Sequence, residues 1–197
     1  MAEIFAILSG LILAAGAPPY LIDILKGKTK PERATWFIWS VLGTIAFFSQ
    51  LSLHGGWSLV FIGLDGLGSI IVFLLSLRYG VGGWSALDKA GLAIATIGVI
   101  ISLLAHDATI ALAGVVLADV AGVALTVQKT FRSPHSETSI TWFFLGTSAL
   151  FGALAVGKMQ FNLLLYPVYL ALANYGVLVS KYAGITLRAT NRAARRP

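Results

Sequence analysis

Long apolar segments, separated by short polar loops, run along the whole sequence. Each is close to the ~20 residues that a helix needs to cross a bilayer. The segments lie at about 3–25, 34–53, 57–78, 87–105, 108–129, 138–157 and 160–183. Lipid offers the backbone no hydrogen-bond partners, so each segment is expected to be a helix, and the period-2 alternation of barrel strands is absent. The pattern predicts an all-α integral membrane protein with seven transmembrane helices.

Composition agrees with the bilayer as solvent. Hydrophobic residues make up 57% of the 197 residues and charged residues only 11%, whereas a soluble domain carries roughly a quarter charged residues. The chain contains no cysteine, which excludes a disulfide framework, a thiolate metal site and a cysteine nucleophile. The first segment is too long for a signal peptide and is interrupted by Pro18-Pro19, so we interpret it as the first membrane span.

The basic residues orient the predicted helices. With the N-terminus outside, the loops after the first, third and fifth helices and the tail lie inside, and they hold 13 of the 14 Lys and Arg residues; only Lys158 lies on the other side. This asymmetry predicts an N-out, C-in topology, which we place in a bacterial inner membrane. It also accounts for the net charge of +6 without nucleic acid as a partner. We expect the inner loops to bind anionic lipid headgroups and the tail from Arg188 to Pro197 to be a disordered anchor on the same lipids.

The sequence also repeats itself. Thr35-Trp36-Phe37 returns as Thr141-Trp142-Phe143, 106 positions later. Each copy follows a basic, proline-containing loop and leads into two further apolar segments that end in a similar Ser-to-Gly motif, at 76–80 and at 180–184. Such a repeat predicts a duplicated three-helix unit, and one extra helix between the copies makes them parallel. This 3+1+3 plan divides the chain into a first repeat (1–80), a linker helix (81–106), a second repeat (107–184) and a basic cytoplasmic tail (185–197).

Residues of the first repeat carry a resemblance to a known family. Pro18-Pro19-Tyr20, the basic loop Lys26–Lys30 and Thr35–Trp39 are similar to a PQ-loop repeat, and the similarity extends over about 11–184. On these residues the chain resembles the PQ-loop or SWEET-like (MtN3-type) superfamily, in detail its bacterial seven-helix members. The resemblance implies a carrier that works by alternating access, with Pro18 and Pro19 as hinges. Pro167, in the last helix, is a further hinge candidate; the alternative for all three prolines is a static kink.

Two carboxylates lie in the hydrocarbon zone, away from the ends of the predicted helices. Asp65 is in the middle of the third helix and Asp119 in the middle of the fifth. A charge at the bilayer centre costs at least ~2.5–3.5 kcal/mol, so such residues usually face the bundle interior and mark a pathway. We predict that Asp119 and Asp65 couple transport to a proton or another cation. The alternative is that both stay neutral and hydrogen-bond across helices, serving assembly only.

The expected solute site adds polar and aromatic residues. Ser69 shares a helical face with Asp65. The resemblance implies that polar residues of the third helix in each repeat bind substrate, which by position points to Asp65 and Asn174. Tryptophans near the inner ends of the second and sixth helices are candidates for stacking on a solute, and the alternative is a belt at the membrane interface. The predicted substrate-binding residues are Asp65, Ser69, Asn174, Tyr169, Trp39 and Trp142.

The remaining polar residues favour structural roles. Glu32 and Glu137 precede the second and sixth segments and are expected to cap those helices beside basic neighbours. Gly80–Gly83 is interpreted as a flexible connector. The three histidines lack metal-ligand spacing, and the motifs of phosphate-binding loops, zinc proteases and serine hydrolases are missing. We therefore expect no metal, no cofactor and no enzymatic activity.

These observations favour a membrane carrier for a small polar metabolite, working by alternating access between the two three-helix repeats, with proton coupling as one option. The alternative is a non-transporting sensor, receptor or assembly module on the same fold. A retinal photoprotein needs a lysine in the middle of the last helix, whereas Lys181 lies at its inner end. Homo-oligomerisation stays open, since the duplication already gives one chain both halves of a pore.

Overall fold

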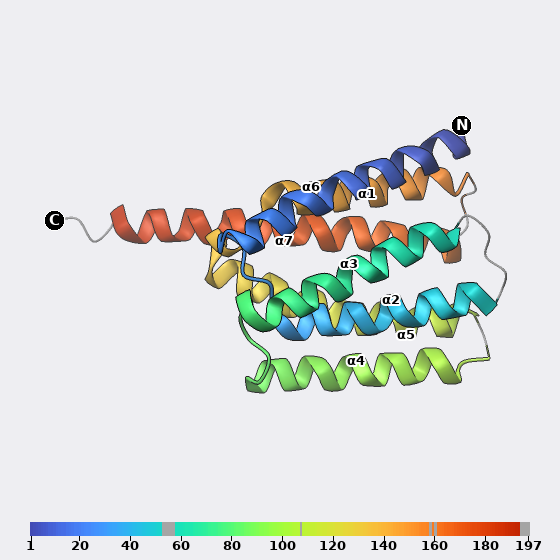
Figure 1. Ribbon diagram of the computed structural model, residues 1–197, viewed down its shortest axis with the longest axis horizontal. Coiled ribbons are helices and arrows are strands. Elements are labelled where there is room, and N and C mark those ends of the chain that lie inside the picture. Colours follow the sequence, from blue (N-terminus) through green and yellow to red (C-terminus); the bar gives the residue numbers. More distant parts are fainter. Residues whose placement is uncertain (53–57, 107, 158, 160, 194–197) are drawn as a thin grey trace. The chain divides into compact units, whose positions relative to one another are not determined.

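The computed structural model describes residues 1–52, 58–106, 108–157, 159 and 161–193. These residues form seven α-helices and one short 3-10 helix (Figure 1). The helices are α1 (Ala2–Leu25), α2 (Arg33–Ser52), α3 (Ser58–Tyr79), α4 (Ala86–Leu104), α5 (Ala108–Arg132), η1 (Pro134–Ser136), α6 (Ser139–Ala155) and α7 (Phe161–Ala193). The all-helical prediction is confirmed, and the first four helices agree with the predicted segments within one residue at each end.

The helices have the length and composition of a membrane protein. Three of them, α1, α4 and the Thr109–Arg132 part of α5, are long and apolar enough to cross a bilayer. The described parts of α2 (Arg33–Phe48) and α6 are apolar but shorter. The chain is therefore helical and suited to a membrane.

The predicted disorder of the basic tail is wrong for most of its length. Helix α7 continues through Arg188 to Ala193, and only residues 194–197 of the predicted tail lie outside the described residues. The Arg188 guanidinium donates a hydrogen bond to the Arg132 carbonyl at the end of α5. Three alanines, good helix formers, stand between residues 183 and 193. The segment thus continues the helix because its residues favour that state and its first arginine has a partner.

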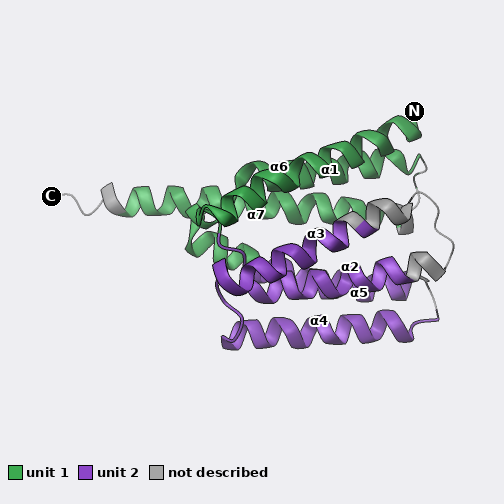
Figure 2. Cartoon of the chain, in the orientation of Figure 1, with its two compact units in different colours: residues 1–29, 126–197 green, residues 30–125 purple. Residues whose placement is uncertain are grey.

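The chain divides into two compact units (Figure 2). Unit 1 contains residues Met1–Thr29 and Thr126–Pro197, which include α1, the end of α5, η1, α6 and α7. Unit 2 contains Lys30–Leu125, with α2, α3, α4 and most of α5. Each unit therefore combines the first helix of one predicted repeat with the second and third helices of the other. The repeat boundaries proposed from sequence stay a prediction, because units of contact and repeats of sequence are different divisions of the chain.

In unit 1, α1 packs on α6, and α6 packs on α7. Ser9 and Ser148 bond reciprocally, each hydroxyl donating to the other residue's carbonyl at 2.9 and 2.8 Å. The Thr141 hydroxyl donates to the Gly16 carbonyl at 2.9 Å. A Cβ added at Gly16 would lie 3.1 Å from the Phe144 Cβ, so glycine lets α1 and α6 approach closely at this crossing.

In unit 2, glycines also set the helix spacing. A Cβ at Gly43 of α2 would lie 2.7 Å from the Gly66 Cα of α3. A Cβ at Gly98 of α4 would lie 2.5 Å from the Gly114 carbonyl oxygen of α5. Neither position has room for a side chain, so the backbones meet directly, as in membrane helix pairs. The core beside these crossings consists of Ile38, Ala95, Ala118 and Ala121.

One pair of contacts has the same form in both units. In unit 2 the Thr35 hydroxyl donates to the Gly122 carbonyl at 2.8 Å, as Thr141 does to Gly16 in unit 1. The two threonines are 141 − 35 = 106 positions apart, and the two glycines are 122 − 16 = 106 positions apart. Both threonines and the Gly16 and Gly122 backbones are buried. Hence the sequence offset of the repeat is also the offset between two equivalent contacts.

Candidate functional site

A buried carboxylate lies at the centre of a polar cluster in unit 1. Glu137, between η1 and α6, forms an ion pair with Lys129 of α5, and the two side chains are 0% and 10% exposed. The other Glu137 oxygen accepts a 2.8 Å hydrogen bond from the Trp142 indole N–H. The Tyr20 hydroxyl of α1 donates to Glu137 at 3.4 Å, and the Lys181 ammonium of α7 donates to its carbonyl at 2.5 Å. We call these five residues the Glu137 cluster; it joins all four α-helices of unit 1 at one point.

A second set of hydrogen bonds supports the Glu137 cluster from the α1 side. Thr138, the N-cap of α6, donates to the Asp23 carboxylate at 2.9 Å. Its hydroxyl also shares a 2.5 Å hydrogen bond with Thr29. The backbone amides of Lys28 and Thr29 in turn donate to the Asp23 carbonyl at 2.9 and 3.0 Å. The basic loop after α1 is therefore fixed to the start of α6.

Unit 2 has a buried carboxylate in a comparable place. Glu32 directly precedes α2, is 3% exposed, and accepts a 2.6 Å hydrogen bond from the Thr35 backbone N–H through Oε2. No described residue donates to Oε1, which is fully buried. Burial raises the pKa of the Glu32 carboxyl above its ordinary 4.5, the Thr35 hydrogen bond opposes this, and the charge of Asp88 adds to the increase.

The Gly80–Gly83 loop is held by hydrogen bonds in this structure, which its interpretation as a flexible connector did not predict. The Arg33 guanidinium donates to the carbonyls of Ser76, Gly80 and Gly82 at 2.8–2.9 Å. Val81 forms an isolated parallel bridge with Glu32, through Val81 N to Pro31 O and Arg33 N to Val81 O, both 2.9 Å. Gly82 and Gly83 have φ of 74° and 115°, a region that favours glycine. The glycines thus allow a tight path, and backbone hydrogen bonds hold it.

Asp88 completes the arrangement from α4. Its Oδ2 accepts from the Gly83 and Ser85 amides at 2.7 and 2.8 Å, while the Ser85 hydroxyl accepts from the Asp88 amide at 3.1 Å. This reciprocal capping box begins α4. Asp88 therefore holds the Gly83 end of the loop, and the backbone of Pro31 and Arg33 holds Val81.

The two acids were expected to be helix caps, and this holds for one of them. Glu32 accepts from the N–H of Thr35, three residues on, as a helix-capping carboxylate does. Glu137 instead binds side chains from other helices, and Thr138 is the N-cap of α6. The signal that sequence reasoning passed over is the repetition itself, since an acid precedes each Thr-Trp pair by three or four positions.

The predicted solute-binding residues fall in both units. In unit 2, Asp65 is exposed, whereas Ser69 and Trp39 are half-buried. In unit 1, Trp142 is buried, and Tyr169 and Asn174 are half-buried. The structure does not gather these six residues within one unit, and their shared role stays a prediction.

Individual contacts restrict what some of these side chains can do. The Trp142 indole lies edge-on to Tyr20, with ring centroids 6.1 Å apart, and its N–H is bonded to Glu137. The Asn174 amide donates to the Leu170 carbonyl at 2.7 Å within its own helix, which leaves its carbonyl oxygen as the acceptor for another group. Asp119, the predicted coupling residue, is 5% exposed in α5.

The predicted hinges lie within continuous helices. Pro18 and Pro19 are inside α1, and Pro167 is inside α7. Pro18 is exposed, and Pro19 and Pro167 are half-buried. The missing N–H of each proline leaves a carbonyl without its helical donor, so these positions stay the predicted points of bending.

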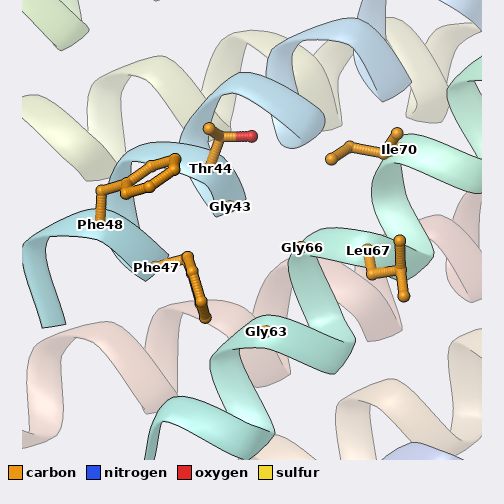
Figure 3. A pocket seen from close by; sticks show the side chains of 8 residues that line it. All are labelled: Gly43, Thr44, Phe47, Phe48, Gly63, Gly66, Leu67 and Ile70. Atoms are coloured by element: carbon orange, nitrogen blue, oxygen red, sulfur yellow. The ribbon is translucent and has the colours of Figure 1, made fainter. Parts of the chain in front are cut away.

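A cavity of about 180 Å³ lies between α2 and α3 (Figure 3). Thr44 is the only residue of its lining with a polar side chain, and the Thr44 hydroxyl already donates to the Ser40 carbonyl at 2.7 Å. The absence of large side chains at three glycines creates the space. The lining consists of Gly43, Thr44, Phe47, Phe48, Gly63, Gly66, Leu67 and Ile70. This cavity suits an apolar group and offers little to a polar solute.

Comparison with known proteins finds no matching family model, no matching curated protein and no matching solved structure. Within the described residues, no three His, Asp or Glu side chains lie close enough together to hold a metal ion. Each unit thus has its own buried carboxylate in a loop: Glu137 of unit 1 is paired with lysine, and Glu32 of unit 2 faces a glycine loop.

Proposed function

We propose that the protein is a carrier of small polar metabolites in a bacterial inner membrane, with its N-terminus outside and the PQ-loop or SWEET-like fold that its sequence resembles. The observation that carries this proposal is the pair of equivalent contacts, Thr35 to Gly122 and Thr141 to Gly16, at one common offset. Equivalent contacts at the repeat spacing support a duplicated helical architecture, which many secondary transporters use. Seven membrane spans in two parallel repeats are part of the same proposal.

The carboxylates within the helices supply the chemistry. Asp65 and Asp119 lie in the middle of α3 and α5. Keeping an acid at membrane depth costs a few kcal/mol, so an acid there usually serves a pathway for solute or protons. Asp65 would hold the solute together with Ser69 and Asn174, and Asp119 would carry the coupling proton or cation.

The buried contacts restrict how alternating access could work. The Thr141–Gly16 bond ties α1 to α6, and the Thr35–Gly122 bond ties α2 to α5. Moving one whole repeat against the other would break both bonds and the close crossing of α1 and α6 at Gly16. A motion that keeps them moves each first helix together with its partner helix from the other repeat.

Solute uptake into proteoliposomes tests the proposal. We expect Asp65→Asn and Asp119→Asn to lower uptake of the transported solute by about 10- to 100-fold, the effect of losing a hydrogen bond or ion contact worth about 1.5–3 kcal/mol. Thr96→Val is the matched control, because Thr96 lies in α4 and its hydroxyl bonds the Leu92 carbonyl of the same helix. Monosaccharides and amino acids form the first solute panel. Unchanged uptake in both aspartate variants would remove these residues from the mechanism.

The absence of cysteine makes the topology equally testable. Single Glu3→Cys and Lys28→Cys variants add one thiol each to a chain that has none. Both parent side chains are exposed. A membrane-impermeant maleimide should label the Glu3→Cys variant in intact cells and the Lys28→Cys variant only after the membrane is opened. The reverse pattern would contradict the N-out orientation.

A non-transporting sensor or assembly module is the second candidate, and the apolar lining of the α2–α3 cavity favours it. Such a protein has no need of a hydrated path. No uptake of any panel solute, with a folded protein of correct topology, would support this second function.

A further inference from the structure

The Glu32 carboxylate differs from every other buried acid of the described chain in its surroundings. It is 3% exposed, and its Oε1 has no hydrogen-bond donor among the described residues. A Cβ placed at Gly82 would collide with this same oxygen, so Oε1 lies directly against the Gly82 backbone. A buried anionic oxygen without a donor is strongly unfavourable. The same oxygen carrying a proton is neutral, so its burial costs much less free energy.

The charges around Glu32 act in the same direction. Asp88, at the start of α4, is 5% exposed and repels a negative charge on Glu32. The Arg33 guanidinium donates to the three carbonyls of Ser76, Gly80 and Gly82 rather than to Glu32. Lys30, in the loop before Glu32, is exposed. Asp88 therefore adds to the rise in the Glu32 pKa that burial causes.

Glu137 provides the internal comparison. It precedes the Thr-Trp pair of α6 by four positions, where Glu32 precedes its own pair by three. Its partners are Lys129 in an ion pair and two further side-chain donors, Trp142 and Tyr20. Three donors stabilise the charged form of Glu137. Glu32 instead accepts hydrogen bonds from Thr35 and Ala34 at the start of α2, and Asp88 adds a like charge nearby.

We propose that Glu32 is a proton-binding site, which holds its proton while the Gly80–Gly83 loop is docked against the start of α2 and releases it to water when the loop moves away. The proton leaves the Glu32 carboxyl for a water molecule, and the carboxylate becomes hydrated. This goes beyond the proposed function, because proton binding at Glu32 requires no transported solute.

The sign of the pH dependence follows from the raised pKa of Glu32. With the loop released, Glu32 titrates near its ordinary 4.5, whereas in the docked state its pKa is higher. The docked loop is therefore most stable below about 4.5 and loses stability as the pH rises through the docked-state pKa. Once the pH exceeds that value, no further loss occurs.

Infrared spectroscopy of the full chain in lipid bilayers tests the site directly. We expect one component of the protonated-carboxyl stretching band to disappear on raising the pH, to be missing in Glu32→Gln, and to persist in Asp65→Asn, Asp119→Asn and Glu137→Gln. Asp88→Asn keeps an acceptor for the Gly83 amide and removes the repelling charge, so it should move the loss of the signal to lower pH. Identical pH-dependent carboxyl bands in the wild type and Glu32→Gln, or no such band in the wild type, would overturn the proposal.

Amide hydrogen exchange provides the structural measurement. The Val81 amide donates to the Pro31 carbonyl and reports docking of the loop. After correction for base catalysis, its protection should fall through the same pH range in the wild type and stay constant in Glu32→Gln. If Glu32→Gln does not fold, Asp88→Asn still tests the proposal. If the pH at which the infrared component disappears is the same in Asp88→Asn as in the wild type, Glu32 is not the proposed site. Neither measurement uses solute uptake. A protein that does not transport can therefore still confirm or contradict the proton site at Glu32.

Discussion

Breaking the Lys129–Glu137 ion pair should destabilise unit 1 more than any other single side-chain change in its polar cluster. The side chains are 10% and 0% exposed, so removing one partner leaves the other charged and buried. Such a loss costs about 3–5 kcal/mol. We therefore expect Glu137→Gln and Lys129→Met each to lower the free energy of unfolding by roughly that amount.

The double variant carries the sharper expectation. With both charges gone, the glutamine amide at position 137 still offers an oxygen to the Trp142 N–H, which donates to Glu137 at 2.8 Å in the wild type. Replacing both members of a buried pair is often close to neutral. The double variant should therefore lose far less than the ~6–10 kcal/mol that the two single losses add up to.

Equilibrium unfolding in mixed micelles, followed by circular dichroism, measures these values. For a chain of this size about 1 kcal/mol shifts the midpoint temperature by roughly 2–4 °C, so each single variant should lie roughly 6–20 °C below the wild type. Glu32→Gln is the matched control, because Glu32 has no lysine in an equivalent place; at neutral pH it should cost less than Glu137→Gln. If the loss in the double variant equals the sum of the two single losses within about 0.5 kcal/mol, Lys129 and Glu137 are not coupled. If each single variant loses less than about 1 kcal/mol, the ion pair is not buried.

Two further predictions concern backbone contacts. Thr35→Val and Thr141→Val each remove one hydroxyl bond to a glycine carbonyl and should each cost about 0.5–1.5 kcal/mol in unfolding free energy; a difference above about 1 kcal/mol between them would argue against equivalent contacts. Gly98→Ala places a Cβ 2.5 Å from the Gly114 oxygen and should lose about 1–3 kcal/mol. Gly68→Ala is the control, because no atom lies within 4 Å of the added Cβ. Its unfolding free energy should stay the same or rise by up to about 1 kcal/mol. Equal losses of unfolding free energy at Gly98 and Gly68 would contradict the close crossing of α4 and α5.

The positions of the helices were predictable because a long apolar run has one stable conformation in lipid. Their pairing was not. Nothing local in α1 says that it packs on α6, since the contact depends on a carbonyl at Gly16 and a hydroxyl at Thr141, 125 residues apart. The sequence nevertheless contains this information, because Gly16 and Gly122 are separated by the repeat offset.

Of the two buried loop acids, the sequence predicts the role of Glu32 but not that of Glu137, because the partners of Glu137 are distant in sequence. An acid before a helix usually caps it, which describes Glu32 but not Glu137, whose partners come from α1 and α5. A hydropathy pattern does not distinguish acids in loops from other polar loop residues, whereas Asp65 and Asp119 stand out because they interrupt long apolar segments. The helical end of α7 is not predictable from the sequence, because clustered arginines are typical of a disordered tail. The hydrogen bond from Arg188 to the end of α5 becomes visible only once the chain is folded.

If the two predicted repeats derive from one ancestral repeat, the composition of the two compact units has a consequence for that ancestor. A protein made of residues equivalent to 1–80 would hold α1, α2 and α3 but neither of the two compact units. To complete one, it would have to swap α1 with a second copy, so that the threonine of each molecule bonds the glycine of the other. Gene fusion would then have preserved an interlocked dimer within one polypeptide.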